Sequence, residues 1–162
     1  MDLIVIIIGV GALAILIIPF FWAHYSAQRK NNAILNNFLK ISGLKREDVG
    51  EMDILHNAVI AIDKNGQVLY HLKTQDNNNY LVRIDLRNID SSEVVTTSQT
   101  IKTKSETYTI VERLELIISQ KDRNKKIIPL VFFDQRETLQ LNGEMPIIEK
   151  WANIIKKNRF QH

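Results

Sequence analysis

The chain has 162 residues, no cysteine and a formal net charge of +3 at neutral pH. The missing cysteine excludes disulfides and thiolate metal ligands, and so small an excess of bases does not suit a protein that neutralises many nucleic-acid phosphates. We therefore expect no nucleic-acid partner.

The N-terminal segment is the most apolar part of the chain. Residues 3–22 run LIVIIIGVGALAILIIPFFW without a single charge. A helix of about twenty apolar residues crosses the hydrocarbon layer of a bilayer, and glycine and proline are tolerated there. A cleaved signal peptide would need a basic start and a small-residue cleavage site, which fit poorly here. The segment therefore predicts a transmembrane helix, with the lipid bilayer as its partner.

Charge predicts the orientation of this helix. The N-terminal side carries only Asp2, whereas five bases follow the apolar segment before the first acid at Glu47: Arg29, Lys30, Lys40, Lys45 and Arg46. These bases are candidate membrane-facing residues. The positive-inside rule then predicts a single-pass protein of the cell membrane with its N-terminus outside and its C-terminal domain in the cytoplasm.

Residues 26–56 are predicted to form a juxtamembrane helix and a linker. Apolar residues recur on one side of a helix from Ser26 to about Ser42, and Gly43 suits its C-terminal cap. Such a one-sided helix fits two arrangements equally, one lying on the lipid headgroups and one packing on the following domain.

From Asn57 the period of apolar residues changes to the alternation typical of strands. Asn65 and Gly66 lie between two apolar runs, a strong hairpin signal. Short connections indicate an antiparallel meander. The predicted strands are 58–63, 68–72, 80–86, 93–99, 108–120 and 127–134, with a short seventh strand at Leu139 and Leu141.

A C-terminal helix follows from Pro146. Its apolar residues recur at helical spacing, and Ile148, Trp151 and Ile155 are predicted to lie in the core of a domain spanning residues 57–158. The order of elements predicts an α+β, mostly β fold in which this helix covers the open end of the strands.

Several segments together resemble the pleckstrin-homology-like (PH-like) domains of bacterial membrane-anchored proteins. They are AIDKNGQVLYHL, YLVRIDLRNIDSSEVV, LELIIS, FFD and EKWANIIKK, within Asn57 to Lys157. The resemblance implies an antiparallel barrel of six to seven strands closed by the C-terminal helix. Such domains bind lipid headgroups, peptides or other domains.

Charged residues suggest local contacts. The resemblance implies that an inositol-phosphate-binding member would carry several bases in and beside the loop joining its first two strands. Here that loop offers only Lys64, which argues against inositol-phosphate binding. A denser cluster, either a contact for anionic surfaces or a solvated hairpin tip, comprises Lys121, Arg123, Lys125 and Lys126. Acids at the ends of predicted strands are expected to bond turn amides, namely Asp63, Asp85, Asp90 and Asp134. Glu112 and Glu115 flank Arg113, which predicts cross-strand ion pairs.

No catalytic, cofactor or metal site is expected, because the four histidines lack metal-ligand spacing and no glycine-rich phosphate loop follows a strand. The sequence predicts a membrane-tethered, non-catalytic binding module. A protein or peptide partner would dock at a sheet edge or beside the C-terminal helix, and no small-molecule substrate is expected. Two alternatives are a structural subunit held through its transmembrane helix and a weak anionic-lipid-binding domain.

Overall fold

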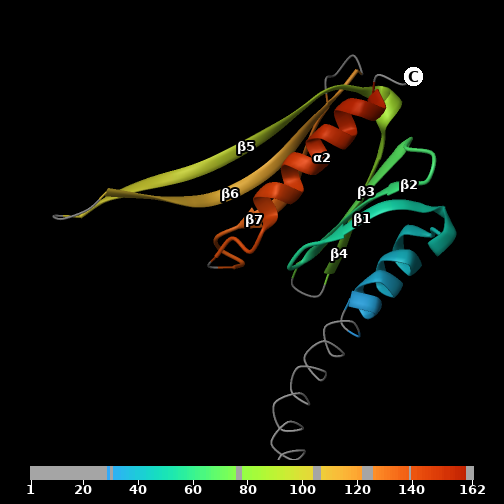
Figure 1. Cartoon of the computed structure of the whole chain (residues 1–162), viewed down its shortest axis with the longest axis horizontal. Coiled ribbons are helices and arrows are strands. Elements are labelled where there is room, and N and C mark those ends of the chain that lie inside the picture. The colour runs from blue at the N-terminus through green and yellow to red at the C-terminus, as the bar shows by residue number, and fades with distance from the viewer. Residues whose placement is uncertain are drawn as a thin grey trace, which may run out of the picture. The chain divides into compact units, whose positions relative to one another are not determined.

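The computed structural model describes residues 29, 31–75, 78–103, 107–121, 126–138 and 140–159. Its contacts divide the chain into two units, Met1–Ile41 and Ser42–His162. In the first unit the structure shows helical residues through 31–41, as the one-sided apolar pattern predicts. The second unit contains the strands and the C-terminal helix (Figure 1).

The membrane prediction needs correction. The apolar segment 3–22 lies outside the described residues. Among the residues that are described, no helix has both the length and the apolar character needed to cross a membrane. The predicted transmembrane helix, and with it the single-pass location and orientation, therefore has no support in the structure.

The first sheet is antiparallel, in the order β1-β2-β3-β4. Its strands are β1 (Val49–Ile54), β2 (Ala58–Asp63), β3 (Val68–Gln75) and β4 (Asn78–Asp85). Between β2 and β3 the predicted hairpin forms: Gly66 adopts a φ of +70°, and the Asp63 carboxylate accepts bonds from the amides of Gln67 and Val68, both at 2.7 Å. The Asn-Gly pair thus marks this turn because glycine adopts a positive φ without strain.

The second sheet has the order β5-β6-β7 and is also antiparallel. Its strands are β5 (Ile89–Lys102), β6 (Thr107–Gln120) and β7 (Ile127–Asp134). A short 3-10 turn, η2 (Leu86–Asn88), leads from β4 into β5, and another, η1 (Arg46–Asp48), precedes β1. Pairing of β6 with β7 ends at Arg113 and Asp134, whereas pairing of β5 with β6 continues to Lys102 and Thr107. The outer parts of β5 and β6 therefore form a two-stranded ribbon (Figure 1).

The helix α2 (Glu144–Arg159) shares one core with both sheets. Its apolar stripe is fully buried at Ile148, Trp151 and Ile155. The core also includes Ile60, Leu69 and Ile84 from the first sheet, and Leu114, Leu116 and Ile118 from the second. Figure 1 shows α2 running beside the second sheet. Burial of this apolar area is the main stabilising contribution to the unit.

The prediction of a closed barrel is wrong. The described strands form two separate sheets, and no described strand of one sheet pairs with a strand of the other. The η2 turn carries the chain from one sheet to the next, and α2 supplies core residues to both, so apolar burial does not require the strands to close on themselves. The coarser prediction of a mostly β, α+β architecture with a C-terminal helix agrees with the structure.

The predicted positions of the strands agree with the structure better than their predicted arrangement does. All six are present, although β5 begins four residues earlier than expected and is longer. The true additional strand is β1, before Asn57, which pairs with β2. The predicted seventh strand does not form: Leu141 is not in a strand, and Leu139 lies outside the described residues.

Candidate functional site

The turn after β7 gathers several polar contacts. It begins at Asp134, the last residue of β7, which is only 5% exposed. Its carboxylate accepts a bond from the Arg136 amide at 3.0 Å. Asp63 and Asp85 likewise accept from amides that follow them. The prediction that strand-end acids bond turn amides is confirmed for these three. It is not confirmed for the fourth, Asp90, which is the second residue of β5 and is contacted by Arg159 at its backbone oxygen.

Arg136 folds back over Asp134 in the same turn. Its guanidinium donates two hydrogen bonds to the carboxylate, from Nε at 2.9 Å and from Nη2 at 2.6 Å. These bonds, helped by the positive charge of Arg113, hold the pKa of Asp134 well below its usual range, despite burial, which acts in the opposite direction. Because the side chain of Arg136 is 79% exposed, the pair closes the turn at the surface.

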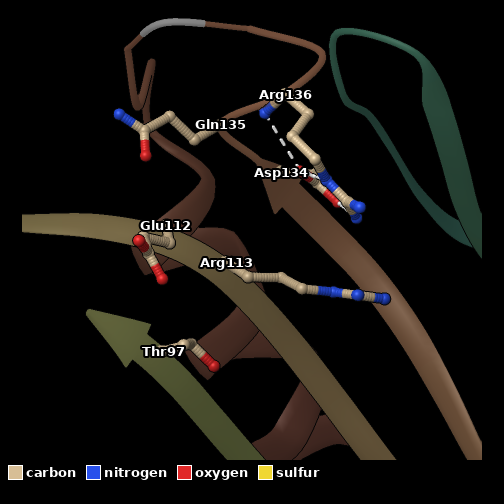
Figure 2. A pocket seen from close by; sticks show the side chains of 6 residues that line it. All are labelled: Thr97, Glu112, Arg113, Asp134, Gln135 and Arg136. Carbon is tan, nitrogen blue, oxygen red and sulfur yellow. Dashed lines mark hydrogen bonds and ion pairs between the residues drawn. The ribbon is translucent and has the colours of Figure 1, made fainter. Parts of the chain in front are cut away.

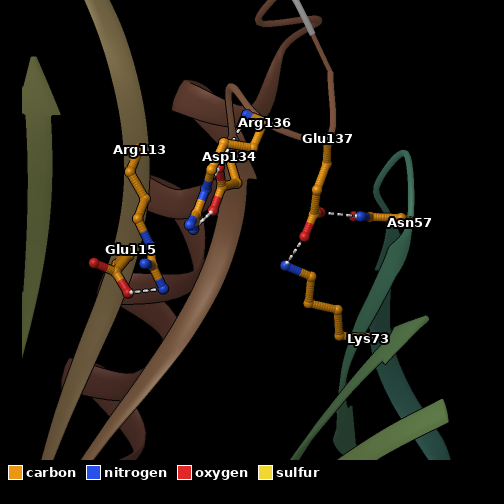
Figure 3. Close-up of polar contacts among 7 residues, drawn as sticks. All are labelled: Asn57, Lys73, Arg113, Glu115, Asp134, Arg136 and Glu137. Atoms are coloured by element: carbon orange, nitrogen blue, oxygen red, sulfur yellow. Dashed lines mark hydrogen bonds and ion pairs between the residues drawn. The ribbon is translucent and has the colours of Figure 1, made fainter. Parts of the chain in front are cut away.

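Glu137 connects this turn to the first sheet. Its carboxylate accepts a hydrogen bond from Lys73 Nζ at 2.8 Å and another from the Asn57 side-chain amide. Figure 3 shows one carboxylate oxygen of Glu137 facing each of these two residues. Lys73 and Glu137 are only 15% and 21% exposed in their side chains, so solvent screens this ion pair less than an exposed one. The contact joins parts of the chain 64 residues apart.

Arg113 lies beside the turn on β6. It pairs with Glu115 at 3.0 Å, two residues along the same strand, so the prediction of cross-strand ion pairs is wrong here. Its Nε is buried without a hydrogen-bond partner. An open pocket of about 350 Å³ is lined by Thr97, Glu112, Arg113, Asp134, Gln135 and Arg136 (Figure 2).

This cluster is best described as a structural clamp. The carboxylates of Asp134, Glu137 and Glu115 each have a cationic partner, so their charges are compensated within the protein. Within the described ranges, no group of three or more histidine or acidic side chains is arranged to hold a metal ion. The buried Nε of Arg113 is closed to solvent and offers no ready contact to a ligand.

Comparisons with known proteins add no assignment: the chain matches no protein-family model, no curated protein and no solved structure. The resemblance to PH-like domains remains a prediction, and function has to be argued from the chain's own surfaces.

Besides the clamp, the outer edge of β5 is a second candidate site. This strand lies at one end of its sheet, and no described strand pairs with its outer side. From Glu93 to Lys102 its residues are exposed, apart from intermediate burial at Val94 and Ile101. The segment from Val94 to Ile101 contains no charge, proline or glycine. Native sheet edges usually carry such protective residues, because unpaired main-chain groups attract further strands.

The opposite edge of the same sheet differs. Pro129 on β7 has no N–H group for an added strand. The backbone of Val131 accepts a hydrogen bond from His71 of the first sheet, and the His71 ring lies 6.1 Å from that of Phe132. The β7 edge is therefore partly occupied from within the domain, whereas no strand in the described part of the chain covers the β5 edge.

The bases singled out from the sequence do not form one described site. Among the candidate membrane-facing residues, Arg29, Lys40 and Arg46 are exposed, Lys45 lies 3.9 Å from Glu47, and Lys30 lies outside the described residues. In the second cluster, Lys121 donates to the backbone oxygen of Arg87 at 3.1 Å and Lys126 is exposed. Arg123 and Lys125 fall outside the described residues.

One partly buried anchor, between β1 and α2, was missed by sequence reasoning. Asp53 on β1 accepts hydrogen bonds from Trp151 Nε1 at 2.8 Å and from Lys150 at 2.6 Å. Lys150 also pairs with Glu51 at 2.8 Å. The hydrogen bond to Asp53, followed by that to Glu51, raises the pKa of the Lys150 ammonium. The sequence carries no signal for this contact beyond the presence of a tryptophan N–H that needs a partner when buried.

Proposed function

We propose that this chain is a non-catalytic binding module that takes an extended segment of a protein partner onto the β5 edge. The observation that supports this proposal is the open, uncharged edge of β5 from Val94 to Ile101. In strand addition, main-chain hydrogen bonds supply affinity and alternate side chains supply specificity. The partner would extend the order β5-β6-β7 by one strand.

Two features of the domain suit this use of the edge. β5 is anchored at its start, where Ile89 is fully buried in the core. β6 then holds β5 in register to Lys102, and between Ser91 and Lys102 no residue of β5 is left without a partner on β6. Over this range the pairing has one register shift, between Thr97 and Ser98, where the extra residue lies on β6. Because β5 is held along its inner side, its outer side is already ordered, and only the partner segment has to lose conformational entropy on binding.

Selection from an unbiased display library of extended peptides, with the full chain as target, tests the proposal. Hydrogen exchange should then show that a selected peptide slows exchange of β5 amides. Val95→Lys places a charge on this edge and should abolish binding, because charged residues block strand addition. Tyr80→Lys on β4 is the matched control, since Tyr80 is 56% exposed on an edge strand of the other sheet. Protection confined to β4 or α2, or failure to select any peptide, would contradict the proposal.

A further inference from the structure

We propose that the segment fitting the β5 edge is the β5 strand of a second copy of this chain, paired antiparallel about Ser98. This inference rests on the proposed function, because both use the same edge. It would join two three-stranded sheets into one continuous sheet with the order β7-β6-β5-β5-β6-β7.

The pleat of a strand restricts how it can pair with itself. Residues directly opposite one another in an antiparallel pair point to the same face of the sheet, and successive residues point to opposite faces. A two-fold related pair of β5 strands must therefore match odd-numbered residues with odd ones and even with even. Centring on Ser98 satisfies this condition, with Ser98 opposite its own copy.

This register groups exposed apolar side chains. It sets Val95 of each copy directly opposite Ile101 of the other, and Ile101 already lies opposite Tyr108 on β6. Val95 and Tyr108 are 36% and 44% exposed, two of the four large apolar side chains that are exposed among the described residues. Shifting the centre to Thr97 would set Val95 opposite Gln99 and Ile101 opposite Glu93, so this grouping would be lost.

The same register avoids charge repulsion. Within the paired segment from Val94 to Lys102 the only charge is Lys102, which lies opposite Val94 of the other copy. No like charges face each other across the two-fold axis. Pairing over this segment would form about eight to ten main-chain hydrogen bonds, since each hydrogen-bonded pair of residues exchanges two.

Single cysteines can test this geometry cleanly, because the chain has no cysteine of its own. The test uses the full chain in mild detergent, which keeps the apolar segment 3–22 in solution. Ser98→Cys places two thiols directly opposite, within the Cα separation that a disulfide bridges. Mild oxidation should convert most of this variant to a covalent dimer.

Thr100→Cys is the matched control, since Thr100 is exposed on the same face of the same strand. In the proposed register Thr100 lies opposite Thr96, so the two thiols would be offset by about 14 Å along the strands and should remain reduced. Equal cross-linking at both positions would refute the register.

A charge exchange provides an independent test. Ser98→Asp and Ser98→Lys each set like charges directly opposite, which destabilises a strand pair, so each variant alone should be monomeric. Mixing the two chains should restore a dimer, measured by sedimentation. Dimers that persist in either variant, or a mixture that stays monomeric, would contradict self-pairing.

The two proposals can fail separately. If neither cross-linking nor charge exchange shows a dimer while selected peptides still bind the β5 edge, self-pairing is wrong and the binding module stands. If Val95→Lys changes neither peptide binding nor self-association, the β5 edge is not a binding surface and both proposals are wrong.

Discussion

The two ends of β6 lie in opposite surroundings. Around Leu114, Leu116 and Ile118 the strand is paired with β5 on one side and β7 on the other, and these three residues are fully buried in the common core. At Thr107, Tyr108 and Thr109 it is exposed, because β7 has ended and only β5 accompanies it. The same hairpin thus provides stability at one end and free surface at the other.

Irregularities mark the boundary between these two parts. Glu112 has no partner on β5, and the β6–β7 pairing shifts between Leu114 and Glu115. Such bulges increase local twist and redirect a strand. Beside them, the turn after β7 is fixed by Asp134, Arg136 and Glu137. We infer that the clamp stabilises the place where the ribbon leaves the core.

The largest expected effect lies in the buried part. Trp151→Ala removes a fully buried side chain and should lower the free energy of unfolding by about 3–5 kcal/mol, because a large cavity forms where both sheets and α2 meet. Denaturant unfolding followed by circular dichroism measures the change. Unchanged stability would show that α2 is not docked on the sheets.

Buried His71 should make stability depend on pH. Burial, followed by the positive charge of Lys73, lowers the pKa of His71 from 6.5 to about 4. The unfolded chain therefore binds a proton at this histidine more readily than the folded chain does. The contribution of neutral His71 to the free energy of unfolding should be fully present above pH 6.5, and the free energy should fall by about 3 kcal/mol as the pH drops towards 4.

A histidine replacement isolates this effect. His71→Phe should flatten the stability curve between pH 6.5 and 5, measured by denaturant unfolding at each pH. Arg87 and Arg136 lower the pKa values of Asp85 and Asp134, so stability from these acids is lost only below the usual aspartate range, at lower pH. An equally steep slope in His71→Phe would assign the pH dependence to other groups.

A smaller effect is expected at the anchor between β1 and α2. Asp53→Ala leaves the Trp151 N–H buried without its acceptor and should cost about 1–3 kcal/mol. Asp53→Asn keeps an acceptor oxygen and should cost less. Glu51→Gln is the control, since Glu51 and Lys150 are 48% and 40% exposed and such pairs contribute little. Equal losses in all three variants would contradict a specific role for the tryptophan bond.

The smallest effect belongs to the ribbon. Tyr108→Ala should change the free energy of unfolding by no more than about 0.5 kcal/mol, because Tyr108 is exposed outside the core. The same variant should weaken self-association at β5, where Tyr108 lies beside Ile101. A large stability loss would mean that the ribbon belongs to the folding core after all.

Local chemistry determined much of what could be predicted. Alternating apolar residues located six strands, Asn65 and Gly66 located their first hairpin, and helical spacing located α2. Three strand-end acids bond nearby amides as predicted, since each such contact spans at most five residues. Apolar periodicity also placed Ile148, Trp151 and Ile155 on the side of α2 that is buried.

Contacts between distant residues were decided only by the tertiary structure. β1 carries a glycine and two acids and has no alternating pattern, so its strand conformation depends on pairing with β2 and on contact with α2. The clamp joins Glu137 to Lys73 and Asn57 across long separations in sequence. Whether the strands close into a barrel or form two sheets depends on which edges meet. Periodicity determines which face of a strand is apolar but not which strands lie beside it. For this reason only the folded structure shows that no described strand pairs with the outer edge of β5.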